Sequence, residues 1–272
     1  MIDSEFNLKK IYVTLFLVSI YFLSYSIYEL FYIYDIYSCD RLNLCINSEL
    51  RLSYSQIYFL QLIKILASAL ILWPKTRTLS LMILLSTQCL FMFANKFLHS
   101  PEQAYLNFLI LILIVMNLTQ ILNTDSKIAE KMKTHLIWVY SVVFFLSYSY
   151  SGFTKYSTNS WMQGDFMLGF FKTNHLVYSS IYFQYVPKDI FSILTFGVVF
   201  MEMFSFLSIF SRPLKVFFWF GLTFIQVGLI LTTDLWQVSF GMLVCHIFVM
   251  DGYFINLKIW PGNRIKKFNL KN

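Results

Sequence analysis

Long apolar stretches, separated by short polar segments, recur along the 272-residue chain. Each has roughly 17 to 25 residues, enough for a helix to cross about 30 Å of hydrocarbon. None alternates apolar and polar residues as the strands of a membrane barrel do. The pattern predicts an all-α, multi-pass membrane protein, a bundle of about eight transmembrane helices. The expected spans are residues 11–34, 57–73, 79–95, 104–122, 135–153, 190–210, 216–232 and 236–250.

The composition supports the same class. Charged residues make up 13% of the chain and hydrophobic residues 58%, whereas a typical soluble domain has about 25% charged residues.

The first span is long and lacks a small-residue cleavage site, so we expect a signal anchor rather than a removed signal peptide. No internal repeat or broken helix is visible, so a transporter is not favoured. We predict one membrane domain, residues 1–272.

The distribution of basic residues predicts the orientation of the spans. With an even number of spans, fourteen of the 21 lysines and arginines fall on the side of the two termini and six in the other loops. This asymmetry favours an N-in/C-in arrangement in a cell membrane. The net charge of +7 then reflects basic loops and a basic tail, residues 252–272, that face anionic lipids, with no nucleic acid as partner. Segments 35–56, 96–103 and 153–189 would be extracytoplasmic.

Two cysteines, Cys39 and Cys45, lie six positions apart in the first extracytoplasmic segment. An oxidising compartment preserves disulfides, and a short loop can bring the two Cα atoms within reach. A Cys39–Cys45 disulfide is one interpretation, and two free thiols are the other. No His/Cys/Asp cluster has metal-ligand spacing, so no metal site is predicted.

Four ionisable residues fall inside the predicted spans: Glu29, Lys64, Glu202 and His246. A charge at the bilayer centre costs about 2.5 to 3.5 kcal/mol, which makes each a functional candidate. Lys64 is expected to pair with Glu29 or Glu202, or to snorkel outward, and His246 to pack in the core. Glu29 extends a tyrosine stripe that suits packing or a flat, amphipathic ligand. The stripe consists of Tyr21, Tyr25, Tyr28 and Tyr32.

The segment "YSYSGFTKYSTNSWMQGDFM", residues 148–167, interrupts the apolar pattern after the fifth span. It contains Gly152-x-x-Lys155 and, after a polar turn, Trp161-x-x-Gly164. One interpretation makes Lys155 a lysine that snorkels to the membrane interface. Residues 165–174 are expected to form a short interfacial helix or a buried re-entrant piece.

This spacing resembles the signature of the HTTM family, the membrane domain shared with vitamin K-dependent γ-glutamyl carboxylases. Members show an "A-G-x-x-K…W-x-x-G" element after a central membrane helix. The resemblance implies that Lys155 is the base that deprotonates a reduced, vitamin K-like quinone. Such a base must be a neutral amine, and burial lowers the pKa of a lysine from about 10.4. The residues expected to bind substrate or shape the pocket are Gly152, Trp161, Gly164, Glu29, Glu102, Lys64 and Glu202.

The chain departs from the carboxylases in two respects. It stops soon after the last span, where they carry a large lumenal domain that recognises protein substrates. Positions that resemble the carboxylases' histidines read Glu102, Gln103 and Gln226 here. The resemblance therefore implies a reduced or different activity, as in small bacterial relatives that accompany the maturation of exported antimicrobial peptides.

Two hypotheses follow from the sequence. The first is a quinol-linked modification or maturation enzyme for an exported peptide, with an extracytoplasmic lysine base. The second is a non-catalytic membrane partner for the export, maturation or immunity of a small peptide, which binds that peptide or another membrane protein.

Overall fold

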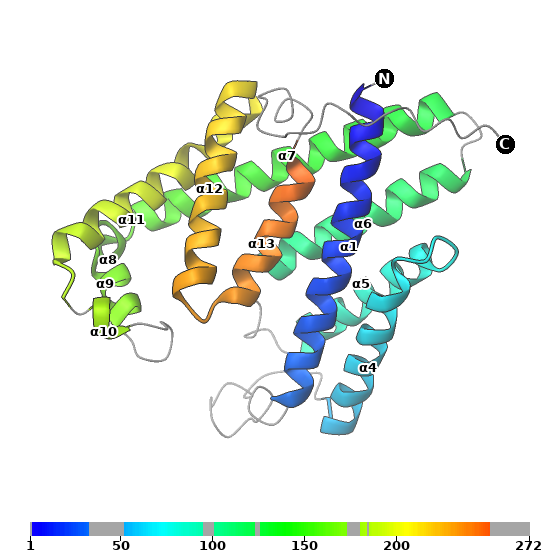
Figure 1. Cartoon of the computed structure of the whole chain (residues 1–272), viewed down its shortest axis with the longest axis horizontal. Coiled ribbons are helices and arrows are strands. Elements are labelled where there is room, and N and C mark those ends of the chain that lie inside the picture. The colour runs from blue at the N-terminus through cyan, green and yellow to red at the C-terminus, as the bar shows by residue number, and fades with distance from the viewer. Residues whose placement is uncertain are drawn as a thin grey trace, which may run out of the picture.

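The computed structural model describes residues 2–32, 52–94, 101–122, 126–172, 180–183 and 185–250. These residues form helices and connecting turns without a strand, which confirms the all-α class for this part of the chain (Figure 1). The α-helices are α1 (Ile2–Phe31), α4 (Tyr54–Leu70), α5 (Arg77–Ala94), α6 (Pro101–Leu122), α7 (Ser126–Tyr156), α8 (Asn159–Met162), α9 (Asp165–Lys172), α10 (Ser180–Phe183), α11 (Lys188–Met203), α12 (Arg212–Thr232) and α13 (Trp236–Val249). A 3-10 helix, η2 (Phe204–Ile209), continues α11.

Five helical segments are long and apolar enough to cross a membrane, which indicates an integral membrane protein. They are Lys9–Phe31, Glu102–Leu122, Lys127–Tyr156, Lys188–Ile209 and Arg212–Thr232. The apolar segments Arg77–Met92 and Trp236–Val249 are shorter, and α4 has 17 residues. A helix therefore covers each predicted span, whereas eight crossings and the N-in/C-in orientation stay predictions.

The exposed surface of α12 shows why these helices belong in lipid. Phe217, Phe220, Phe224 and Leu231 lie three, four and seven positions apart and are all exposed. This spacing places them on one face of the helix. A soluble protein rarely exposes so large an apolar face to water, whereas a bilayer accommodates it without cost.

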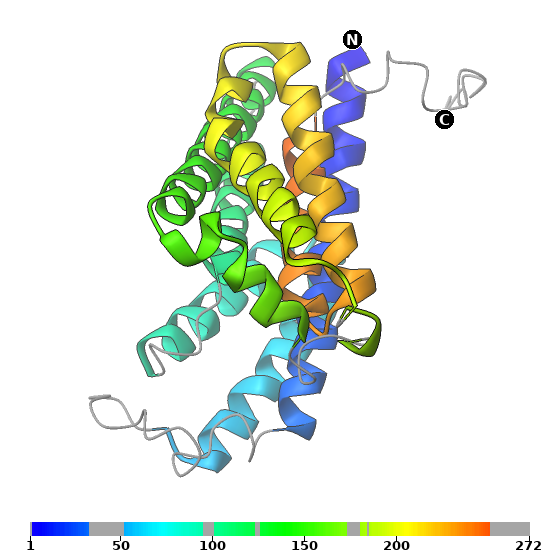
Figure 2. The ribbon, with the colours of Figure 1, turned by 90° about the vertical axis from the view of Figure 1, so that its left-hand side faces the viewer.

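The start of α1 and the end of α13 lie at the same end of the bundle. Lys10 Nζ donates a hydrogen bond to the carbonyl of Met250 at 2.7 Å and lies 5.7 Å from the centre of the Phe248 ring. Helix α13 packs between α1 and α12, and α7 runs obliquely past them (Figure 1). The short helices α8 and α9 pack against α11 (Figure 2).

The sixth predicted span is helical throughout but not regular, because it changes from an α-helix to a 3-10 helix at a point that we call the break. Helix α11 ends one residue after Glu202 and continues as η2. Side chains at the break bond to backbone groups there: Ser205 Oγ lies 2.7 Å from the carbonyl of Glu202 and 2.9 Å from that of Phe145 on α7. Ser149 Oγ accepts a hydrogen bond from the backbone N–H of Phe206 at 2.8 Å. A break inside an apolar span is tolerated where protein groups meet its backbone in this way.

Gly152 allows α7 and α11 to cross closely at this break. A Cβ at this position would collide with the main-chain nitrogen of Met203 and lie 2.6 Å from its Cα. Both atoms belong to the backbone and cannot rotate away. The absence of a side chain at Gly152 therefore fixes how near the two helices approach.

We predict that Gly152→Ala lowers the free energy of unfolding by about 1–3 kcal/mol or more, because an overpacked contact forces backbone shifts. Thermal unfolding of the detergent-solubilised protein measures the change. Gly197→Ala on α11 is the matched control, since a Cβ there has no neighbour within 4 Å. It should be neutral or stabilise by about 0.5–1 kcal/mol, because alanine favours helix. Equal stabilities of the two variants would contradict the close crossing.

Candidate functional site

An ion pair between α7 and α11 forms the centre of the candidate site. Lys155, in the last turn of α7, places Nζ 2.6 Å from both carboxylate oxygens of Glu202. The Lys155 side chain is 22% exposed and that of Glu202 only 8%. The Lys155 side chain is therefore partly accessible, whereas the Glu202 side chain is buried in the bundle.

The Trp161-x-x-Gly164 part of the motif lies against the same amine. The Trp161 ring centre is 4.8 Å from Lys155 Nζ, a cation–π contact. The indole stacks on Phe166 of α9 at 4.1 Å. Gly164 joins α8 to α9 with a φ of +75°, in the left-handed region that favours glycine. A Cβ there would lie 2.8 Å from the backbone nitrogen of Ser192, so Gly164 also allows this turn to rest on α11.

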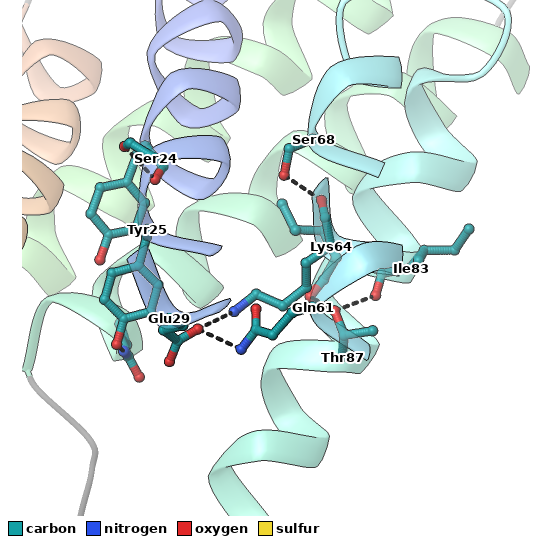
Figure 3. A network of polar contacts seen from close by, with 11 residues as sticks. Ser24, Tyr25, Glu29, Gln61, Lys64, Ser68, Ile83 and Thr87 are labelled. Carbon is teal, nitrogen blue, oxygen red and sulfur yellow. Dashed lines mark hydrogen bonds and ion pairs between the residues drawn. The ribbon is translucent and has the colours of Figure 1, made fainter. Parts of the chain in front are cut away.

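A second buried ion pair joins α1 to α4 (Figure 3). Glu29 Oε2 accepts hydrogen bonds from Lys64 Nζ at 3.1 Å and from Gln61 Nε2 at 2.6 Å. The Lys64 side chain is 1% exposed. The rings of Tyr25 and Phe91 contact the ammonium, with centres 5.3 and 4.9 Å from Nζ. This lysine is therefore enclosed by protein on all sides.

The two ion pairs show which of the alternatives for Lys64, pairing with Glu29, pairing with Glu202 or snorkelling, is found in the structure. It bonds to Glu29 and does not snorkel, and Glu202 bonds to Lys155 instead. The sequence analysis did not anticipate the Lys155–Glu202 pair, because its members are 47 positions apart on different helices. The only signals were that Glu202 falls inside an apolar span and that Lys155 follows the end of another. Gln61 was missed as well, because a single amide in an apolar stretch has no distinctive spacing.

The tyrosine stripe of α1 and the start of α6 pack beside the second pair. The Tyr25 hydroxyl accepts a hydrogen bond from Gln103 Nε2 at 2.9 Å, and its ring stacks on Tyr21 at 5.7 Å. Glu102 is 1% exposed. A Cβ added to Gly241 of α13 would lie 3.0 Å from Glu102 Cγ and 3.1 Å from Tyr21 Cε2. Glu102 therefore packs with the tyrosine stripe, at the junction of α1, α6 and α13.

The residues expected to form one pocket are thus distributed over two clusters. Gly152, Trp161, Gly164 and Glu202 gather around Lys155, whereas Glu29, Lys64 and Glu102 lie on the side of α1, α4 and α6. Cys39 and Cys45 fall outside the described residues. In the described ranges, no group of three or more His, Cys, Asp or Glu side chains is placed to hold a metal ion.

His246 packs in the core, as expected from the sequence. It is fully buried, and its Nδ1 lies 2.8 Å from the backbone carbonyl of Met242. Its ring meets those of Phe144 and Tyr148 edge to face, at 5.0 and 5.7 Å.

Residues 165–172 form helix α9, which includes the buried Phe171 and the exposed Phe166. The helix therefore has one face against protein and one facing outward.

We predict that Glu29→Gln lowers the free energy of unfolding by about 3–5 kcal/mol, because it leaves the Lys64 ammonium buried without a countercharge. Adding Lys64→Met should restore most of the loss. Asp165→Asn is the control, since it breaks the exposed Lys188–Asp165 pair, and such pairs contribute about 1 kcal/mol or less. Chemical unfolding in detergent measures all three, and a loss for Glu29→Gln no larger than the control's would refute the buried pair.

Comparison of the chain with protein-family models, curated protein sequences and solved structures gave no match. The resemblance to the HTTM family therefore depends on the motif at residues 151–164. In the structure, Trp161 of the second half of that motif lies against the amine of Lys155 of the first half.

Proposed function

We propose that the protein is an integral-membrane enzyme that removes a proton from a quinol-like substrate during the modification of an exported peptide. The observation that supports this proposal is the Lys155–Glu202 pair. The pair places an amine beside a carboxylate and against the Trp161 ring, and the lysine is the more exposed of the two side chains. The proposed site faces the extracytoplasmic side of a cell membrane, and its chemistry resembles the proton abstraction of the HTTM family.

Glu202 gives Lys155 a way to become a base. In the resting pair the lysine carries the proton and the carboxylate balances its charge. In the proposed reaction the buried Glu202 carboxylate takes this proton from Lys155, which leaves a neutral pair. The neutral amine then accepts the proton of a quinol hydroxyl. The pair has gained one proton, and the quinolate anion replaces the carboxylate as the partner of the ammonium.

Trp161 would hold the substrate against the amine. Its indole already lies beside Lys155 Nζ and is fixed by stacking on Phe166. A flat aromatic ring stacks favourably on such a surface. The neighbouring α7 side chains Phe153 and Tyr156 are 52% and 54% exposed. They provide an apolar approach from the lipid, which suits a greasy quinol and requires no aqueous channel.

One observation favours the second candidate, a non-catalytic membrane partner. The segment around α10 exposes Tyr182 by 73% and Tyr185 by 83%. Exposed tyrosines are enriched where proteins bind partners, so this surface fits an exported peptide or another membrane protein. In that role the Lys155–Glu202 pair would only fasten α7 to α11.

We predict that Lys155→Arg abolishes proton abstraction while it preserves the ion pair, because arginine is not deprotonated in proteins. The purified protein in nanodiscs is mixed with a reduced naphthoquinone without oxygen, and the quinolate anion is followed by its absorbance. Wild type should form quinolate, and Lys155→Arg should form at least about tenfold less, a difference of about 1.4 kcal/mol.

Lys188→Ala is the matched control, since Lys188 is an exposed lysine of α11 with a surface partner, and it should behave as wild type. Unfolding temperatures of all variants separate loss of function from loss of fold. Equal quinolate from wild type and Lys155→Arg would exclude the base role. No quinolate from wild type would favour the non-catalytic partner.

A further inference from the structure

The turn that joins α8 to α9 rests on Ser192 of α11. Ser192 Oγ donates a hydrogen bond to the carbonyl of Gln163 at 3.0 Å. The other acceptor near this hydroxyl, the carbonyl of Lys188 in its own helix, is farther away, at 3.4 Å. A Cβ added to Gly164 would lie 2.6 Å from Ser192 Oγ and 2.9 Å from Ser192 Cα. Ser192 therefore meets the end of the Trp161-x-x-Gly164 segment with both its hydroxyl and its backbone.

These contacts restrict where Trp161 can lie. The backbone N–H of Gly164 donates to the carbonyl of Trp161 at 3.0 Å, so the segment between them is a closed turn. Helix α8 has only four residues. Gln163 follows Trp161 by two positions, a distance of about 7 Å even in a fully extended chain. Holding Gln163 against Ser192 therefore leaves the Trp161 backbone little freedom.

The ring that stacks on Trp161 depends on the same turn. Phe166 lies 4.1 Å from the indole, measured between ring centres. It belongs to the first turn of α9, where the N–H of Leu168 donates to the carbonyl of Gly164 at 2.9 Å. Both rings therefore leave the chain close to Gly164. The indole in turn lies against Lys155, with Nζ 4.8 Å from the ring centre.

Helix α11 carries both the support of this turn and the acid of the ion pair. Glu202 follows Ser192 by ten positions, which is about 15 Å along the axis of the helix. The amine of Lys155 contacts both parts of the site, Glu202 at 2.6 Å and the Trp161 ring at 4.8 Å. A substitution at Ser192 is therefore remote from the ion pair, but it can move the aromatic ring beside it.

The turn has a second, more exposed contact with α11. Lys188 Nζ lies 2.6 Å from Asp165 Oδ1, and these side chains are 53% and 43% exposed. Exposed ion pairs contribute little to stability. Ser192 is partly buried and also touches the turn with its backbone. Ser192 and Lys188 are therefore a matched pair of positions on one helix, of which only Ser192 is expected to fix the turn.

We propose that Ser192 is a positioning residue, which holds the Trp161 ring against the amine of Lys155. The inference rests on the proposed function, in which a quinol ring stacks on Trp161. Ser192 acts on that substrate through the indole and takes no part in proton transfer. Displacement of the turn should therefore weaken the binding of the quinol, while the Lys155–Glu202 pair keeps its ability to accept a proton.

A double-mutant cycle with quinolate formation in nanodiscs tests this inference. Ser192→Val removes the hydroxyl and adds bulk at the contact with Gly164. We expect it to raise the half-saturating concentration of a reduced naphthoquinone about two- to tenfold, the range that a stacked aromatic pair contributes. Quinolate at saturation should stay at the wild-type level. In a Trp161→Ala background, Ser192→Val should add no further rise, because the contact through which it acts is absent.

A second measurement does not require quinolate formation. The protein is labelled with 5-fluorotryptophan, and the fluorine resonance of Trp161 is assigned by its absence in Trp161→Phe. Lys155→Met should shift this resonance, because it removes the charge beside the ring. Ser192→Val should shift it as well and leave the other tryptophan resonances in place. Lys188→Ala is the control and should shift neither the resonance nor the half-saturating concentration.

An unshifted Trp161 resonance in Ser192→Val would overturn the positioning role. An equal rise in half-saturating concentration with and without Trp161 would overturn it too, because Ser192 would then act by another route. Wild type that forms no quinolate would refute the proposed function, and the fluorine resonance would still decide whether Ser192 positions Trp161. Should Ser192→Val fail to fold, Ser192→Ala removes the hydroxyl alone and should shift the same resonance.

Discussion

The close crossing of α7 and α11 at Gly152 is the contact on which the candidate site depends. Because no side chain separates the helices there, Glu202 comes within 2.6 Å of Lys155. The same crossing brings Ser149 of α7 to the backbone of η2, whose regular helical bonding is broken. A larger residue at position 152 would separate the charges and the backbone groups together. The close approach that Gly152 allows is therefore required both for the ion pair and for the contacts at the break.

The cost of charge in hydrocarbon explains why the two lysines have such specific surroundings. Each is matched by one carboxylate, and the ammonium groups also contact aromatic rings, two at Lys64 and one at Lys155. The pairs differ in one respect that bears on function. Lys64 is enclosed and Lys155 borders the surface. An enclosed pair can hold helices together, whereas a partly exposed lysine can also meet a substrate.

The helices were predictable from the sequence, but their interruptions and pairings were not. Apolar length alone predicts where a helix must cover a span, and each expected span contains one. Helix α7 begins well before its predicted start because residues 126–134 are helical without being apolar. The break after Glu202 leaves no local signal, since the residues on both sides are equally apolar. It depends on Ser149 and Gly152 from another helix, so tertiary contacts decide it.

The sequence predicted only part of the candidate site, because spacing along the chain identifies only residues that are close in sequence. The motif spacing singled out Lys155, Trp161 and Gly164, which are close in sequence and close in space. Glu29 was assigned to the same pocket because it is a charged residue in an apolar span, and Glu102 because its position resembles that of a carboxylase histidine. The structure places both in a separate cluster. Spacing identifies neighbours along one segment, whereas the assignment of distant residues to one site requires the helix packing.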